Sequence, residues 1–371
     1  MISMRLTILL GSGSSLPAKM PSTEEITSRV RSGEGITRCS DSVYRLTQGT
    51  AHTATNAGVL LLTKALFSEI EDYYGGRRSD PVNYETCCFL ATQLHDAESG
   101  EFDNPAVKAL IEKLSQNEQL CTLIADDKDR LHLFEETENY IRDVVWGMLK
   151  RRPATVQHLN WLVNMVHDES VQSINLVTLN HDTALEQVLS SSSVSFCDGF
   201  GEPVNRVRFW QPDLFQDAER VRLVKLHGSI DWFFFRSDRN IGIPQNHDRW
   251  LTAPRPELLI GTFNKMLEYT RGIFADLHCY FHRCLRQTQF LVCCGYGFGD
   301  KGINTKLSEW INADPDRRLV VIHANSHNLF ERSRGAIANH WTRWKKEKKL
   351  RLIEKWIEEI SWDEVKQALL C

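Results

Sequence analysis

Five short runs of β-branched residues and leucines place the strongest constraint on the fold of this chain. Apolar residues fill these runs without the alternation of a half-exposed strand, which is typical of strands buried on both faces of a parallel sheet. Most of the remaining chain has helical patterns. We therefore predict an α/β fold with a parallel sheet and helices on both of its faces. The predicted strands are Arg5–Leu10, Ile174–Leu179, Arg220–Leu226, Gln289–Cys294 and Arg317–His323.

Each of these runs leads directly into a cluster of small or polar residues. In chain order the clusters read GSGSS, TLNHD, HGSID, GYGFGD and ANSH. In open α/β sheets, ligands bind beyond the carboxyl ends of the strands. Polar clusters at five strand ends therefore predict a ligand site along that edge of a Rossmann-like sheet.

The long region between the first two runs has a different character. Thr55–Tyr74, Ala106–Leu114 and Leu131–Lys150 repeat apolar residues with a helical period, and another helical pattern follows Pro153. We predict that residues 39–170 form a large helical insertion. The Rossmann-like domain then comprises residues 1–38 and 171–371. The sequence leaves open whether the insertion is a lid or a subunit contact.

The C-terminal segment has one clear signal. Ser361 and Glu364 have the spacing of a capping box, which predicts a final helix. The charged stretch before it, residues 345–360, fits a helix or a strand equally well.

Composition excludes several classes of protein. The formal net charge of −4 gives no bulk attraction to nucleic acid or to an anionic membrane. The basic residues at 345–349 are expected to be a solvated surface, with nucleic-acid binding as a minor alternative. The run Leu6–Leu10 is too short for a secretory signal, and no apolar stretch reaches the length of a membrane span. The 10 cysteines lack disulfide or zinc spacing, so we expect buried thiols in a cytoplasmic protein.

The first polar cluster has the composition of a phosphate-binding turn. Gly11 and Gly13 would let the backbone approach a pyrophosphate without a Cβ in the way, and N–H groups around Ser12 and Ser15 would act as donors. The third glycine of the dinucleotide fingerprint is absent. A tight structural turn is therefore an equal alternative.

The second cluster places two polar side chains at a strand exit. Asn180 and Asp182 are two residues apart, so both side chains lie on the same side of the exit, close to Thr178. An asparagine can donate and accept hydrogen bonds, which suits holding a ribose or a water molecule. Asp182 can bind a sugar hydroxyl, or it can cap the helix predicted at Thr183–Leu189.

The remaining clusters add a histidine and more glycines. His227 follows the third run directly, where an imidazole can act as a general base near neutral pH. A buried structural histidine is the alternative. Gly295 and Phe298 belong to a glycine-dense turn that permits another close backbone approach. Asn325 follows the fifth run and is a candidate for binding the adenosine half of a dinucleotide.

A metal site is the less favoured interpretation of a histidine pair. His278 and His282 are one helical turn apart with Cys284 nearby, and these residue types are metal ligands. No further ligand has a suitable spacing. We therefore expect solvent-facing histidines on a helix, and no metal.

Taken together, the clusters have the order and spacing of sirtuin-like domains. The segment KLHGSIDW at residues 225–232 is the most specific of them. The chain most resembles the bacterial branch of this family that is found in antiphage defence systems. The catalytic asparagine and histidine of the family match Asn180 and His227. The resemblance covers Arg5 to about Gly35 and Ile174 to about Ser326.

Departures from the family pattern bear on the activity. Lys19 stands where the first motif of the family has its later glycine. Sirtuin deacylases carry paired Cys-x-x-Cys zinc units, and this chain has no such pair. The long helical region instead resembles the insertions of NAD⁺-hydrolysing relatives. The resemblance therefore implies an NAD⁺ glycohydrolase without zinc, with NAD⁺ as its substrate.

The resemblance also implies roles for the matched residues. Asn180 would position the attacking water, His227 would act as the base, and Asp182 would bind the nicotinamide ribose. The turns at Gly11–Ser15 and Gly295–Gly299 would hold the pyrophosphate and adenosine side.

The biological setting follows from the same resemblance. Such domains deplete NAD⁺ after phage infection, and we expect a homo-oligomer held together by the helical insertion. A HerA-type ATPase or a short Argonaute is the expected partner. One alternative is a sensor or scaffold subunit that binds NAD⁺ or ADP-ribose without turnover. Another is an NAD⁺-dependent deacylase or ADP-ribosyltransferase.

Overall fold

The computed structural model describes residues 3–47, 57–74, 82–101, 104–215, 220–245, 255–262 and 265–370. Contacts between residues divide the chain into two compact units. The first contains the N-terminal segment up to Met20, Arg152–Leu258 and the chain from Met266 onward. The second contains Pro21–Arg151 and Leu259–Lys265.

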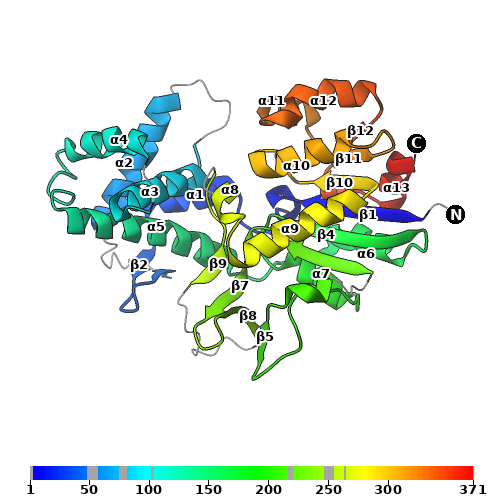
Figure 1. Cartoon of the computed structure of the whole chain (residues 1–371), viewed down its shortest axis with the longest axis horizontal. Helices are drawn as coiled ribbons and strands as arrows, with labels where there is room; N and C mark the ends of the chain where they lie inside the picture. The colour runs from blue at the N-terminus through cyan, green and yellow to red at the C-terminus, as the bar shows by residue number, and fades with distance from the viewer. Residues whose placement is uncertain are drawn as a thin grey trace. The chain divides into compact units, whose positions relative to one another are not determined.

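A six-stranded parallel sheet forms the centre of the first unit, in the order β12-β11-β10-β1-β4-β6 (Figure 1). The chain starts at β1, adds strands on one side and then returns to add strands on the other. The ends of β1 and β10 therefore mark the topological switch point, where ligands bind in such sheets. The strands are β1 (Met4–Leu10), β4 (Val171–Thr178), β6 (Val221–Lys225), β10 (Phe290–Cys294), β11 (Arg318–Ile322) and β12 (Leu350–Ile353).

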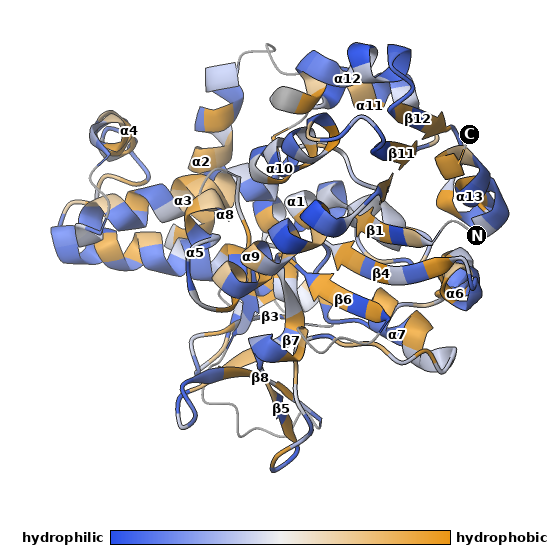
Figure 2. Cartoon of the chain, turned by 45° about the vertical axis from the view of Figure 1, so that its right-hand side comes forward, coloured by the Kyte–Doolittle hydropathy of each residue, from blue (hydrophilic) through white to orange (hydrophobic). Residues whose placement is uncertain are grey.

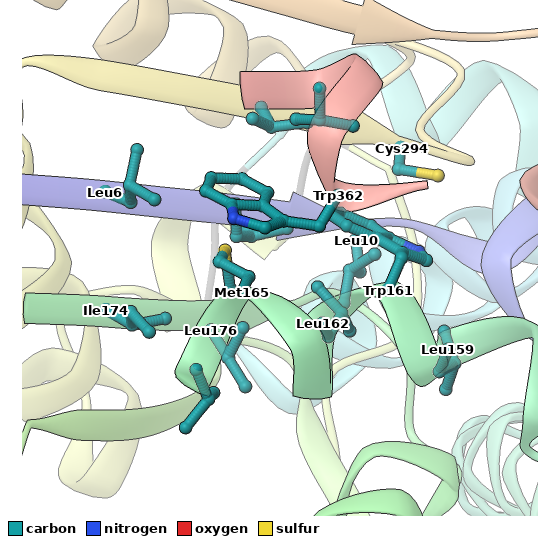
Figure 3. Packing of buried hydrophobic residues seen from close by; sticks show 14 of the residues in the cluster. Leu6, Leu10, Leu159, Trp161, Leu162, Met165, Ile174, Leu176, Cys294 and Trp362 are labelled. Carbon is teal, nitrogen blue, oxygen red and sulfur yellow. The ribbon is translucent and has the colours of Figure 1, made fainter. Parts of the chain in front are cut away.

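Helices cover both faces of this sheet, so the predicted fold class is confirmed. One face packs against α6 (Asn160–His167), α7 (Ala184–Ser191) and α13 (Trp362–Leu370), whose apolar residues form one buried cluster with the strands. Figure 2 shows hydrophobic stretches along β1, β4 and β6. Figure 3 shows Trp362 among the strand leucines of this cluster. On the opposite face α9 (Gly272–Gln287) contacts β1 and β6, and α10 (Lys301–Asn312) packs against α9.

All five predicted strands are present, and their ends lie within three residues of the predicted ends. The ambiguous C-terminal stretch contains the sixth strand, β12, after α11 (Ser326–Arg332) and α12 (Ala336–Lys346). The final helix begins as predicted, because the Ser361 hydroxyl accepts from the Glu364 N–H at 3.3 Å. The Glu364 carboxylate binds Lys355 instead of completing the capping box.

A second, antiparallel sheet in the first unit was not predicted. Its order is β5-β8-β7-β9. Only β7 contains part of a predicted motif, since it starts at the glycine that follows His227. The strands are β5 (Val207–Phe209), β7 (Gly228–Phe235), β8 (Asn240–Pro244) and β9 (Pro256–Leu258). The short helix α8 (Lys265–Glu268) follows them.

The second unit is mainly helical. The predicted helices correspond to α2 (Ala57–Tyr74), α4 (Pro105–Ser115) and α5 (Asp127–Leu149), while residues 55–56 of the first prediction lie outside the described residues. The unit also contains α1 (Thr23–Ser32), the unpredicted α3 (Tyr84–Ser99) and a hairpin of β2 (Ile36–Arg38) and β3 (Tyr44–Leu46).

The contact-defined units have boundaries near residues 20 and 151 rather than 38 and 170. The proposed division into an NAD⁺-binding domain and an insertion remains a prediction. Within the described part of the chain, no helix is both long and apolar enough to cross a membrane.

Candidate functional site

The turn after β1 packs against the turn after β10. The Gly11 N–H donates to the Cys294 carbonyl at 3.1 Å, and the Gly13 N–H donates to the Gly295 carbonyl at 2.9 Å. A Cβ on Gly11 would lie 2.7 Å from the Gly295 oxygen, and one on Gly13 would lie 2.9 Å from the Gly295 Cα. These glycines are therefore required by the contact between the two turns, and their N–H groups already have acceptors.

The rest of this first turn forms a short 3-10 helix, η1 (Ser12–Ser15). Ser12 is exposed, whereas Ser14 and Ser15 are buried. His158 Nε2 lies 2.9 Å from the Ser14 carbonyl oxygen. Because a carbonyl only accepts, this nitrogen is the donor. Lys19, where the family has a glycine, takes the left-handed φ of 60° that a glycine would favour.

Asn180 ties the turn after β4 to the turn after β1. Its Nδ2 donates to the Gly11 carbonyl at 3.0 Å and to the Ser15 hydroxyl at 2.9 Å. Since the Gly11 carbonyl only accepts, the amide orientation is fixed with its NH₂ towards β1. Among the described residues, Asn180 Oδ1 has no hydrogen-bond partner. The acceptor end of this amide therefore remains for a ligand. Thr178 supports the turn, because its hydroxyl accepts from the Asn180 N–H at 3.0 Å.

Asp182 is buried and takes part in the start of α7. Its Oδ1 accepts from the N–H of Ala184, the first residue of α7, at 2.9 Å, although Thr183 and not Asp182 occupies the N-cap position. Its backbone carbonyl accepts from the buried Lys225 ammonium, which also pairs with Glu186 at 2.7 Å. This arrangement joins the end of β6 to the turn after β4. A ribose-binding role for Asp182 remains a prediction.

His227 lies at the end of β6 with only 4% of its side chain exposed. Its Nε2 is 3.4 Å from Asp300 Oδ2, within ion-pair distance when the ring is protonated. The ring centroids of His227 and His181 are 6.4 Å apart. The Ile230 N–H and the His181 carbonyl connect the same two turns at 3.0 Å. The predicted Asn180 and His227 thus lie on adjoining turns that are bonded to each other.

The surroundings of His227 contain residues that the sequence analysis did not select. The Tyr269 hydroxyl donates to Asp300 Oδ2 at 2.7 Å. The Tyr269 ring stacks on His278, with centroids 3.6 Å apart. Burial and then the nearby charge of His227 lower the pKa of His278 to about 3. The sequence signals for this group were Asp300, the last residue of GYGFGD, and His278, which was considered only as a metal ligand.

The expectation of two solvent-facing histidines on this helix was wrong for His278. His278 is buried on the face of α9 that contacts Tyr269, while His282 is exposed. Four residues correspond to slightly more than one helical turn, and this was enough to place one histidine inside and the other outside.

The GYGFGD turn is held by its own side chains. Phe298 has φ 51°, is fully buried and packs against Tyr296 and Trp341. The Asn304 Nδ2 donates to the Phe298 carbonyl at 2.8 Å. The Phe298 side chain is thus part of the core, and only its backbone position leaves room for a role in ligand binding.

Asn325 lies at the end of β11 and is exposed. Its Oδ1 accepts from the Asn328 N–H at 3.0 Å, so it caps α11. Within the described part of the chain, no interaction connects it with the turns after β1, β4 or β6. Of the predicted residues, those after β1, β4, β6 and β10 form one continuous set of turns, and Asn325 stands apart from it.

Among the described residues, no group of three or more His, Cys, Asp or Glu side chains could hold a metal ion.

Part of the chain matches a known protein family. Residues 174–353, from within β4 to the end of β12, match the SIR2-like domain family. This segment is slightly less than half of the chain, and its match agrees with the sirtuin-like resemblance; the antiphage branch remains a prediction. No curated protein matches the chain.

Several solved structures are similar to the chain at low identity. A Sir2 homologue mutant in complex with ADP-ribose has 10% identity over 98% of this chain and 91% of that chain, with a TM-score of 0.40. Sir2 bound to an acetylated peptide has 8% identity over 99% and 94%, with a TM-score of 0.41. A complex of Sir2, a p53 peptide and NAD⁺ has 9% identity over 92% of each chain, with a TM-score of 0.36.

Proposed function

We propose that the chain binds NAD⁺ and hydrolyses its nicotinamide–ribose bond, giving nicotinamide and ADP-ribose. The observation that carries this proposal is the fixed amide of Asn180, whose acceptor oxygen is left for a ligand at the carboxyl edge of the sheet. A buried histidine lies on the adjoining turn. The match of residues 174–353 to the SIR2-like domain family supports the same ligand class.

The chemistry requires little beyond positioning and a base. When the C–N bond breaks, its electron pair goes to the pyridinium nitrogen and neutralises it, so nicotinamide is a good leaving group. Asn180 Oδ1 would accept a hydrogen bond from the attacking water and align it with the anomeric carbon. The water adds its oxygen to that carbon, and its proton goes to His227.

Substrate binding would use the turns around this pair. The Gly11 and Gly13 N–H groups are already engaged, so the pyrophosphate would be bound by the exposed Ser12 and by backbone groups of residues 295–299. Asp182 would bind the nicotinamide ribose through the carboxylate oxygen that does not accept from the Ala184 N–H. Asn325 would contact the adenosine side.

The test follows NAD⁺ loss and nicotinamide release by purified protein. Asn180→Ala and His227→Ala are expected to reduce the rate at least ~100-fold, because each removes a group that acts on the water. Asn117→Ala and His327→Ala are matched controls at exposed positions, and they should keep the full rate. Full activity in either site variant removes that residue from the mechanism.

The same assay separates the alternatives. Saturable NAD⁺ binding without turnover would favour a sensor or scaffold. Deacylation of an added acetyl-lysine peptide, or transfer of ADP-ribose to a protein, would favour the other enzyme classes.

We propose further that this activity serves antiphage defence, with a homo-oligomer as the active form. A HerA-type ATPase or a short Argonaute would be the partner. This step rests on the sequence resemblance alone. NAD⁺ depletion in infected cells that express the chain with its neighbouring gene would support it, and unchanged NAD⁺ levels would refute it.

A further inference from the structure

Asp300 faces the proposed base and is itself rigidly held. Its Oδ1 accepts from the Ile303 N–H at 3.0 Å and so caps α10. Its Oδ2 accepts from the Tyr269 hydroxyl at 2.7 Å and lies 3.4 Å from His227 Nε2. The carboxylate is 12% exposed, so water screens it poorly.

Tyr269 is fixed in turn by a buried ring. It stacks on His278 with an interplanar angle of 21°, and it lies nearly parallel to His227 at a centroid distance of 6.4 Å. His278 comes from α9, and only 4% of it is exposed. A hydroxyl held in this way keeps the carboxylate from rotating away from the imidazole.

We propose that Asp300 is a positioning residue whose carboxylate orients His227 and stabilises its protonated form. This inference rests on the proposed function, in which His227 is the base. When the His227 ring takes the proton of the attacking water, the imidazolium forms beside the negative charge of Asp300, 3.4 Å away, which stabilises it.

Among the described residues, four side chains of the first unit lie near His227. They are His181 after β4, Tyr269 after α8, His278 on α9 and Asp300 before α10. Of these four, Asp300 is the one carboxylate. Removing the negative charge of Asp300 is therefore expected to lower the pKa of His227.

The decisive variant is Asp300→Asn. Asparagine is a good N-cap, so the bond from the Ile303 N–H and the start of α10 are retained, and only the charge is lost. We expect kcat to fall at least tenfold and the acid limb of the kcat/KM profile to move to lower pH by about one unit. Asp126→Asn makes the same change at the N-cap of α5 and should leave both quantities unchanged. Tyr269→Phe keeps the stack on His278, and a several-fold loss of kcat is expected.

A second measurement keeps this inference separate from the proposed function. The imidazole NMR signals of histidine-labelled protein are titrated, with His227 assigned by its loss in His227→Gln. A titration of His227 about one unit lower in Asp300→Asn supports the positioning role, even if wild type does not consume NAD⁺. An unchanged titration of His227, or an active Asp300→Asn enzyme with the wild-type pH profile, overturns the inference and leaves the proposed hydrolysis standing.

Discussion

Gly295→Ala tests whether the close contact between the turns after β1 and β10 requires a glycine at this position. Gly295 has a left-handed φ of 63°, which costs an L-residue about 1–2 kcal/mol. Its added Cβ would lie 2.7 Å from the Gly13 carbonyl carbon and even closer to the Ser14 nitrogen. These atoms are backbone, so the turns must separate. Overpacking costs about 1–3 kcal/mol, and the lost bond between Gly13 and Gly295 costs about 1 kcal/mol.

The sum of these costs is about 3–6 kcal/mol, a large part of the stability of a typical domain. At about 2–4 °C for each kcal/mol, the melting temperature should fall by at least roughly 6 °C. Tryptophan fluorescence reports the transition, since the chain has 10 tryptophans. Gly297→Ala is the matched control, because no atom lies within 4 Å of its added Cβ. A melting temperature of Gly295→Ala within roughly 2 °C of wild type would refute the packing argument.

Three further variants test other parts of the first unit. Burial lowers the pKa of His278 from its ordinary value of 6.5 to about 3, so this histidine stays neutral in the folded protein. Below pH 6.5 the unfolded chain binds a proton at His278 that the folded protein does not bind, and the free energy of unfolding therefore decreases as the pH falls. His278→Phe keeps the stack on Tyr269 and removes the titrating group. Between pH 7 and pH 5, the unfolding free energy of this variant should therefore decrease by about 2 kcal/mol less than that of wild type. Equal decreases for the two proteins in urea titrations would contradict this expectation. Asn304→Ala leaves two carbonyls and the Tyr296 hydroxyl without this buried partner, and we expect a loss of about 3 kcal/mol by urea unfolding. Asp168→Ala removes the acceptor of Trp362 and Lys366, both at 2.7 Å, and should lower the unfolding free energy by about 2 kcal/mol.

The sheet could be predicted because buried parallel strands have a simple composition. Runs such as residues 289–294 contain almost only residues that bury on both faces, and their polar exits define the direction of the site. The sixth strand, Leu350–Ile353, was ambiguous because it lies at the sheet edge among charged residues, where helical and strand patterns coincide. The antiparallel sheet was missed because its strands are three to eight residues long and depend on distant partners.

The site could be predicted only in part, for a similar reason. Asn180 and His227 follow strands, so their neighbourhood could be derived from strand order. Tyr269 and His278 reach His227 from a connecting segment and from α9, and no local pattern in the sequence indicates that approach. A histidine on an amphipathic helix can lie on either face, and only the packed structure decides which.

The glycines of the site have a structural meaning that also affects its chemistry. The density of glycines in the sequence suggested that a ligand approaches the backbone closely. In the structure, Gly11, Gly13 and Gly295 have no room for a Cβ because the turns after β1 and β10 pack against each other there. That contact presents the Gly11 carbonyl to the Asn180 amide, and the amide is then left with one orientation. The close packing of the turns therefore determines which atom of Asn180 can receive a ligand. A substitution that separates the turns should thus impair catalysis even if the chain still folds, since the acceptor oxygen would no longer be held in place.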